Sequence, residues 1–224
     1  MYDRMVSAIL DHRLLPGTKL GEDKLATAFG VSRTRIRPVL VRLASEQVVT
    51  LTPNRGATVA QPGVQEAREV FEVRRMIEPT LVALFIERAT REDMAALSQC
   101  IAQEEQAREA GDMHRAIRLS GNFHLLIAQS AGHQTLGRIL REMVSRTSLV
   151  LMTYGTATAT LRDESSSTCG CREHRALLDA IRLRDPREAA RLMVDHLQRL
   201  EAQLQFTPAA APVADLGRLF NAAA

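Results

Sequence analysis

Residues 22–60 read EDKLATAFGVSRTRIRPVLVRLASEQVVTLTPNRGATVA. Helical periodicity covers two short segments of this stretch, about 22–29 and 32–46, and Gly30 stands between them. Two short helices joined by a tight turn that contains glycine are typical of a helix-turn-helix. A further helical pattern over residues 2–12 precedes them.

The second half of the same stretch predicts a β-hairpin. Two runs rich in β-branched residues, 48–51 and 57–60, flank a turn from Pro53 to Gly56. A helix-turn-helix followed by a hairpin is a winged helix. We therefore expect residues 1–62 to form a winged helix-turn-helix domain that binds DNA.

The N-terminus of the second helix is the candidate DNA-binding site. Ser32 can cap this helix, because its hydroxyl can accept a hydrogen bond from the first turn. Three arginines follow within five residues. Cations at this end oppose the helix dipole, but arginine there suits phosphates and guanine edges in a major groove. The alternative is a solvated basic turn. The residues that we assign to DNA binding are Ser32, Arg33, Thr34, Arg35 and Arg37, with Arg55 and Gly56 at the hairpin tip.

The charge distribution also indicates a polyanionic partner at this end of the chain. Residues 1–62 contain nine Lys or Arg and five Asp or Glu, whereas residues 63–224 contain 20 and 21. The basic excess is confined to the first quarter of the sequence, as expected for a DNA-binding domain.

The composition excludes several classes of protein. A hydrophobic content of 46% argues against disorder, and no apolar run approaches the roughly 18 residues of a membrane span. Asp3, Arg4 and Asp11 interrupt the segment that would be apolar in a signal peptide. Three cysteines do not make a disulfide framework. We expect a cytoplasmic protein with no membrane partner.

Residues 63–206 carry helical periodicity with few breakers and predict an antiparallel all-α bundle of five to seven helices. The fold class is therefore mainly α. The expected connections lie near residues 89–91, 111–112, 131–132, 154–171 and 184–186. Residues 155–170 are expected as a frayed helix end or a mobile loop. Residues 207–224 are expected as a flexible tail, in which residues 215–220 could form a short docked helix.

Three histidines lie on apolar stripes of this helical region, at His124, His174 and His196. Taken one at a time, each is more simply a core histidine with a hydrogen-bond partner. Three inward histidines on three helices are harder to explain by packing, because each buried ring needs a polar partner. A shared divalent metal ion, most simply zinc or nickel, would satisfy all three.

Two arginines are candidates for binding an acidic small molecule. Arg74 falls on an apolar stripe between Val70 and Ile77, one turn before Glu78. It either binds an effector carboxylate or forms an intrahelical pair with Glu78. Arg146 is the second candidate. We assign Arg74, Ser120 and Arg146 to effector binding.

The first part of the chain resembles the GntR family of bacterial transcription regulators over about residues 5–60. The resemblance rests on the string LLPGTKLGEDKLATAFGVSRTRIRPVLVRL and on PNRG in the hairpin. It implies that the arginines and the threonine listed above line the major groove and that Arg55 and Gly56 form the wing contact. Arg35 replaces the usual proline, and Pro38 replaces the usual glutamate. Because Pro38 lacks an N–H, we expect a local kink.

The second part resembles the helical effector domain, of FCD type, found in the FadR-like branch of this family. The string VFEVRRMIEP at residues 70–79 is typical of the branch, as are SGNFH at 120–124, EH at 173–174 and DH at 195–196. In the branch an aspartate and three histidines bind a metal. Here Ser120 replaces the aspartate, which leaves a three-histidine site completed by water or an effector oxygen, or histidines that bind the effector directly.

Together these features predict a ligand-responsive transcription regulator, most simply a repressor. It would bind a palindromic operator in double-stranded DNA as a homodimer, since one recognition helix contacts too few bases for useful specificity. Its helical domain would sense a small organic acid. The alternative is a helical metalloenzyme with an appended DNA-binding domain. That enzyme needs a general base near the metal, and Glu173 and Asp195 are expected to point away from it.

Overall fold

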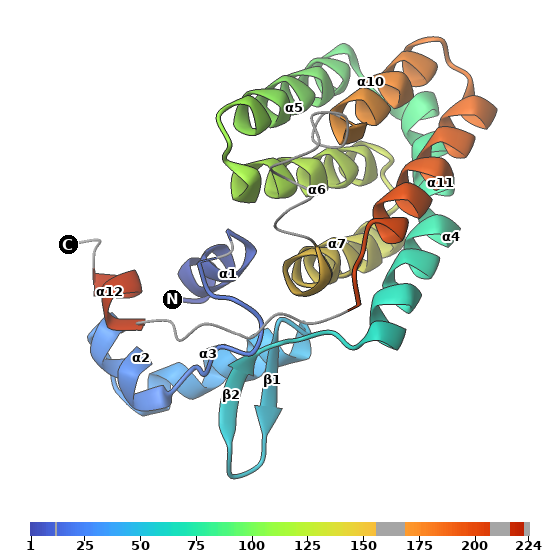
Figure 1. Ribbon diagram of the computed structural model, residues 1–224. Coiled ribbons are helices and arrows are strands. Elements are labelled where there is room, and N and C mark those ends of the chain that lie inside the picture. The colour runs from blue at the N-terminus through green and yellow to red at the C-terminus, as the bar shows by residue number, and fades with distance from the viewer. Residues whose placement is uncertain (12, 156–168, 207–215, 222–224) are drawn as a thin grey trace.

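The computed structural model of the chain describes residues 1–11, 13–155, 169–206 and 216–221 (Figure 1). These residues form a winged-helix unit, drawn at the bottom of the figure, and a larger helical unit above it. The expected mainly α fold class is confirmed. The alternatives stated for residues 155–170 concern a segment that lies almost entirely outside the described residues.

The winged-helix unit contains α1 (Tyr2–Leu10), α2 (Glu22–Phe29), α3 (Arg33–Ser45), β1 (Val49–Thr52) and β2 (Gly56–Val59). Gly30 ends α2 with a φ of 63°, in the left-handed region that glycine adopts without a Cβ clash. The chain can therefore turn sharply into α3. The strands pair antiparallel, with Val49 opposite Val59. The predicted helix-turn-helix and hairpin are both confirmed.

The recognition helix α3 is a single element from Arg33 to Ser45 with Pro38 inside it. The missing N–H of Pro38 therefore does not end the helix. The inner face of α3 buries Ile36, Leu40 and Leu43 in the core of the winged-helix unit. This packing leaves the opposite face of the helix exposed.

The helical unit is an antiparallel bundle of α4 (Val64–Arg88), α5 (Arg91–Glu109), α6 (Met113–Ser130), α7 (Gln134–Tyr154), α10 (Cys169–Arg182) and α11 (Pro186–Ala202). Its breaks fall where turn and capping residues stand in the sequence. Thr90 forms a capping box with Asp93, and the side chains of Asp112 and Asp185 cap α6 and α11. No helix of the described part of the chain is long and apolar enough to cross a membrane.

The two units share a tight contact through α7. Leu149 of α7 is fully buried in the hydrophobic core of the winged-helix unit, and Met152 packs against that core. Arg118 of α6 forms a 2.9 Å ion pair with Asp11, just after α1. The winged helix is therefore held directly by the helices that surround the functional site described below.

The end of the chain contains the short docked helix that was considered for residues 215–220. Residues 216–221 form the short helix α12 (Leu216–Asn221), which packs on α2, whereas residues 207–215 and 222–224 lie outside the described part. Leu216 and Phe220 are buried in the winged-helix core, and the Phe220 ring lies 4.7 Å from that of Phe29. The helix docks because two apolar side chains one turn apart are buried in the winged-helix core.

Candidate metal centre and nucleic-acid interface

The structure brings the three predicted histidines together in the middle of the helical unit. His124 comes from α6, His174 from α10 and His196 from α11. One ring nitrogen of each lies within 4.8 Å of those of the other two. The side chains are only 2%, 0% and 3% exposed. Three rings that converge in this way form one site, whereas separate core histidines would be scattered.

Each histidine is oriented by a glutamate on its outer side. The Nδ1 atoms of His124, His174 and His196 lie 2.6, 2.8 and 2.6 Å from carboxylate oxygens. The accepting residues, in the same order, are Glu78, Glu104 and Glu173. A carboxylate that accepts from Nδ1–H leaves the Nε2 lone pair free to bind a metal ion, which is the usual arrangement around metal-ligating histidines.

Each glutamate also accepts from an arginine through its other oxygen. Arg74 Nε lies 2.5 Å from Glu78 Oε1, and Arg108 Nη2 lies 2.8 Å from Glu104 Oε1. The third distance, from Arg199 Nη1 to the carboxylate of Glu173, is 3.0 Å. The site is thus built from three Arg–Glu–His relays: Arg74–Glu78–His124, Arg108–Glu104–His174 and Arg199–Glu173–His196.

Burial and the neighbouring charges favour neutral His124 and His196 and charged Glu78 and Glu104. Burial raises the pKa of Glu78, but the charge of Arg74 and the hydrogen bonds from His124 and Arg74 outweigh it and hold the pKa at about 2. Burial lowers the pKa of His124 to about 3, with a further decrease from the charge of Arg74. The pKa of His196 is also lowered, mainly by burial. Neutral imidazole is the form that binds a metal ion.

The hydrogen-bonding state of the histidine nitrogens indicates whether the three histidines can hold a metal ion. The Nε2 atoms of His174 and His196 are buried and have no hydrogen-bond partner among the described residues. Leaving buried polar atoms without a partner costs free energy. A divalent ion that accepts all three Nε2 lone pairs removes this cost. The three-histidine group can therefore hold a metal ion.

A cavity of about 80 Å³ reaches His124, one of the three histidines. Arg74, Ser120, His124 and Thr147 are among the residues that line it. Arg74 Nη1 donates to Thr147 Oγ1 at 3.2 Å, while Nη2 is buried without a partner in the described part of the chain. An unpaired buried guanidinium nitrogen in a cavity is a natural contact for an anionic ligand.

The three residues expected to bind an effector are not all placed together. Arg74 and Ser120 line the cavity, and Arg74 also forms the intrahelical pair with Glu78, so both roles considered for it are compatible. Arg146 instead forms an ion pair with Glu66 near the start of α4 and is not among the residues that line the cavity. The side chain that follows it, Thr147, faces the cavity.

The sequence pattern does not show that a glutamate orients each histidine, although it does suggest the pair between Arg74 and Glu78. Glu104 accepts from His174 across 70 positions, a pairing that only the packing of α5 against α10 creates. Glu173 was expected to point away from the metal position. It accepts from His196 Nδ1, the ring nitrogen on the side away from that position. Its place behind the ring suits an orienting residue.

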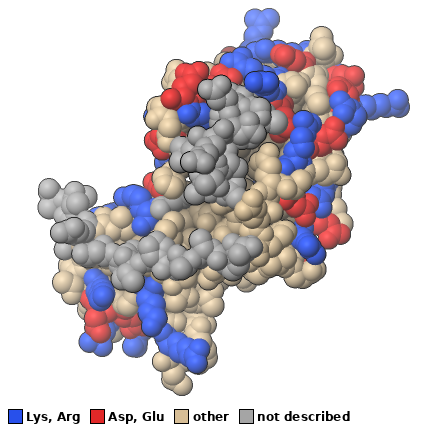
Figure 2. Space-filling view, viewed as in Figure 1, with Lys and Arg blue, Asp and Glu red and all other residues tan. Residues whose placement is uncertain are grey.

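The predicted DNA-binding residues are all exposed on the winged-helix unit. Lys and Arg side chains stand out around this lower end of the molecule in Figure 2. Ser32 is the N-cap residue of α3, but its hydroxyl shares a 2.7 Å hydrogen bond with Thr34 and does not cap the backbone. At the hairpin tip Gly56 has a φ of 83°, which suits glycine there.

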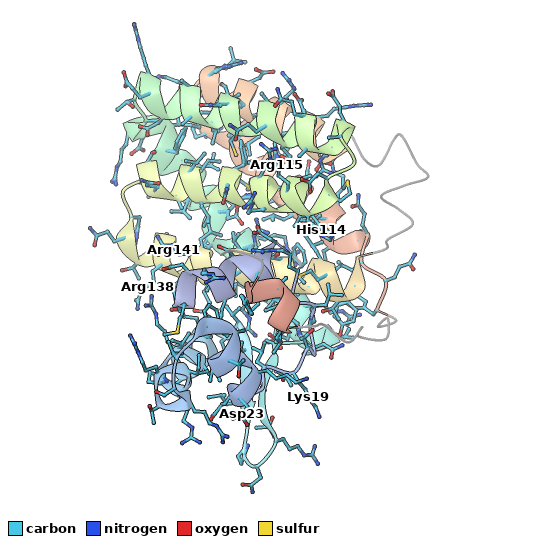
Figure 3. The ribbon with its side chains drawn as sticks, turned by 90° about the vertical axis from the view of Figure 1, so that its left-hand side faces the viewer. Lys19, Asp23, His114, Arg115, Arg138 and Arg141 are labelled. Carbon is cyan, nitrogen blue, oxygen red and sulfur yellow. The ribbon has the colours of Figure 1, made fainter. Side chains whose placement is uncertain are left out.

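Two of the recognition arginines are paired with acidic residues of α2. Arg37 Nε lies 3.0 and 2.9 Å from the two carboxylate oxygens of Glu22, and Arg33 forms an ion pair with Asp23. Asp23 is labelled in Figure 3, where it lies on the surface of the winged-helix unit. The sequence analysis did not foresee these pairs. Arg35, by contrast, makes no ion pair with any described residue.

Comparison with known proteins agrees with both parts of this description. The model of bacterial regulatory proteins of the gntR family matches residues 1–59, and the FCD domain model matches residues 69–199. The chain is 33% identical over 133 residues to the HTH-type transcriptional regulator McbR of Escherichia coli K12. That alignment covers 59% of this chain and spans 58% of McbR, less than two thirds of its length.

Two further similarities cover more of the chain. It is 24% identical over 193 residues to the HTH-type transcriptional repressor RspR of Escherichia coli K12, which covers 86% of this chain and 82% of RspR. The solved structure of E. coli McbR/YncC has the same fold, with a TM-score of 0.77 at 24% identity, over 88% of this chain and 92% of that one. These relatives are named as transcription regulators and not as enzymes. The chain belongs to the gntR family of bacterial regulatory proteins and carries an FCD domain.

Proposed function

We propose that this regulator is a repressor whose operator binding is controlled by a small organic acid held at a metal ion in the helical unit. The observation that carries the proposal is the cavity itself. It is lined by His124 of the three-histidine group and by Arg74, whose Nη2 has no partner among the described residues. A metal ion and a guanidinium on one small cavity suit a carboxylate ligand.

His124, His174 and His196 would hold the ion, with zinc or nickel as the candidates, because neutral imidazole nitrogen suits both metals. The bound ion would supply a positive centre that anchors a ligand oxygen. Glu78, Glu104 and Glu173 would keep the rings in the required tautomer and orientation. Arg74 and Ser120 would contact the ligand from the cavity wall.

The proposed DNA contacts are those expected from the sequence. Arg33, Thr34, Arg35 and Arg37 would enter the major groove, with Ser32 beside them, and Arg55 and Gly56 would contact the backbone through the wing. In the free protein Glu22 and Asp23 hold two of these arginines. DNA must therefore displace two carboxylates before Arg33 and Arg37 can reach base edges.

Control of DNA binding would pass through α1 and α7. Leu10 of α1 lines the cavity together with Thr147 of α7, although Leu10 belongs to the winged-helix unit. A ligand that fits better with one placement of α1 shifts the population toward that placement. We infer that ligand binding moves the two winged helices of a homodimer out of register with the two halves of a palindromic operator. The relative RspR is named as a repressor, which supports repression as the role of this protein. The site of action would be the cytoplasm, where operator DNA is found.

The metal part of the proposal is tested by zinc stoichiometry. Metal-free protein is incubated with excess zinc, passed through a desalting column in malonate buffer and assayed for bound zinc. We expect about one zinc per chain in the wild type and none in His124→Ala. His133→Ala is the matched control and should keep its zinc, because His133 is an exposed residue that caps α7. Equal zinc in wild type and His124→Ala would overturn the assignment.

A further inference from the structure

The fixed charges around the three histidines cancel. Each relay pairs one arginine with one glutamate and one histidine. With all three rings in the neutral form that binds metal, three positive and three negative charges remain. Arg118, which also lines the cavity, leaves this balance unchanged because it pairs with Asp11.

A divalent ion would therefore bring two uncompensated positive charges into a buried site. Isolated charge in a protein interior is costly unless it is paired. All three ligands are neutral imidazoles. The side chain one turn before His124, which lines the same cavity, is the uncharged Ser120. The three glutamates cannot supply the missing charge, because each is already shared between a histidine and an arginine.

We propose that the missing negative charge is supplied by the effector, a short dicarboxylate, and that metal and dicarboxylate bind cooperatively. Neither would be held tightly without the other. This inference rests on the proposed metal site and adds to it the charge of the ligand and the coupling. A dianion cancels the charge of the ion, and it takes the place that an acidic protein ligand would occupy beside Ser120.

The cavity supports this class of ligand by its contacts and its size. One carboxylate can contact the metal position and Ser120, while the other accepts from Arg74 Nη2, which is buried without a partner among the described residues. The volume of about 80 Å³ is far below the roughly 300–1,000 Å³ of pockets for drug-sized molecules. A ligand of two to four carbons is therefore expected.

The test measures zinc affinity in competition with a chromogenic chelator, using metal-free full-length protein. The buffers contain acetate, malonate or inorganic phosphate at equal ionic strength, and protein-free blanks correct for zinc bound by the buffer itself. We expect zinc to bind about 10- to 100-fold more tightly in malonate than in acetate, within the usual range of coupling between two ligands. Phosphate should give a smaller increase, because its single tetrahedral group does not span the metal position and Arg74.

Two variants make the test specific. Ser120→Asp supplies a protein carboxylate one turn before His124, so its zinc affinity in acetate should rise at least tenfold, with little further gain in malonate. Ser145→Asp is the control. It adds the same charge to the wall of the same cavity from α7 and should leave the preference for malonate in place. Melting curves check that both variants are folded.

The outcomes separate this inference from the proposed function. Equal and tight zinc binding in acetate and malonate would overturn the cooperative dicarboxylate while leaving the three-histidine metal site intact. A gain in phosphate that exceeds the gain in malonate would overturn the dicarboxylate in favour of a tetrahedral anion. Absence of zinc binding in every buffer, in the wild type and in Ser120→Asp, would overturn the proposed metal site itself.

Discussion

Thr147 and Leu149, two residues apart on α7, face different parts of the molecule. Thr147 lines the cavity and accepts a hydrogen bond from Arg74, whereas Leu149 is fully buried in the core of the winged-helix unit. A single helix turn thus connects the wall of the ligand cavity to the interior of the DNA-binding unit. No separate linker is needed to carry a signal between them.

This connection predicts the effect of Leu149→Ala. Removal of a fully buried leucine should lower the free energy of unfolding by about 2–5 kcal/mol, measured by urea denaturation. Zinc affinity should change little, because the histidines lie on other helices, but the effect of zinc and malonate on operator affinity should fall. Leu183→Ala is the control, since Leu183 is 81% exposed, and it should change stability by less than about 0.5 kcal/mol. A full ligand response in Leu149→Ala would argue against α7 as the connection.

The relays predict that changes at two adjacent glutamates of α5 will have different effects on zinc affinity. Glu104→Gln keeps an acceptor for His174 Nδ1 but removes the charge that orients the ring and pairs with Arg108. Its zinc affinity should fall about 10- to 100-fold, as is usual when a residue that hydrogen-bonds to a metal ligand is changed. Glu105→Gln loses only a surface pair with Arg175 and should bind zinc like the wild type. Equal affinities in the two variants would show that the relays do not act on the metal.

The recognition helix predicts losses of operator affinity that leave the fold unchanged. Arg37→Ala and Arg33→Ala should each weaken operator binding by about 1–3 kcal/mol in a fluorescence anisotropy titration, on an operator selected from random DNA. Arg191→Ala serves as the control, because Arg191 lies on α11 and pairs with Glu188 and Asp195. Unchanged affinity in both recognition variants would contradict the assignment of α3.

The buried histidines predict a loss of stability in acid. The folded-state pKa of His124 is about 3, below the ordinary value of 6.5. At pH values between these two, the unfolded chain binds a proton at His124 and the folded chain does not. The stability of the metal-free protein should therefore be complete above about pH 6.5 and fall as the pH decreases, by up to about 1.4 kcal/mol per pH unit for each such histidine. Glu78 and Glu104, with folded pKa values of about 2, add to the loss only below about pH 4.5.

Urea midpoints at pH 7.5 and pH 5.5, with EDTA present, measure this effect. The midpoint should be lower at pH 5.5 in the wild type. The difference should shrink in His124→Gln, which has no proton to bind at this position. A midpoint that is independent of pH between these values would show that the folded chain binds as many protons as the unfolded chain, so that burial does not keep the rings neutral.

Sequence reasoning was reliable wherever a local rule decides the structure. Gly30 marks the turn of the helix-turn-helix because it takes a left-handed conformation, and the three histidines were found because they fall on apolar stripes. Gln47 shows the limit of such rules. It has a φ of 60° at the end of α3, where its N–H and that of Val48 close the helix in a Schellman pattern, although a glycine is favoured there.

The remaining features depend on contacts between distant parts of the chain. The partner of His174 lies 70 positions earlier, and Phe220 reaches the winged helix across almost the whole sequence. Nothing in the spacing around Arg37 shows that Glu22 lies beside it, because the pairing follows from the packing of α2 on α3. Periodicity shows which side chains point inward, but only the tertiary structure shows what they meet.

The central claim is that occupancy of the histidine site controls operator binding. Its most direct test is the operator affinity of the full-length protein with zinc and malonate and, in parallel, with EDTA, for the wild type and for His174→Ala. The account predicts that the wild type binds its operator at least about fivefold more weakly with zinc and malonate, while His174→Ala binds equally well in both conditions. An unchanged affinity in the wild type, or the same response in His174→Ala, would contradict it.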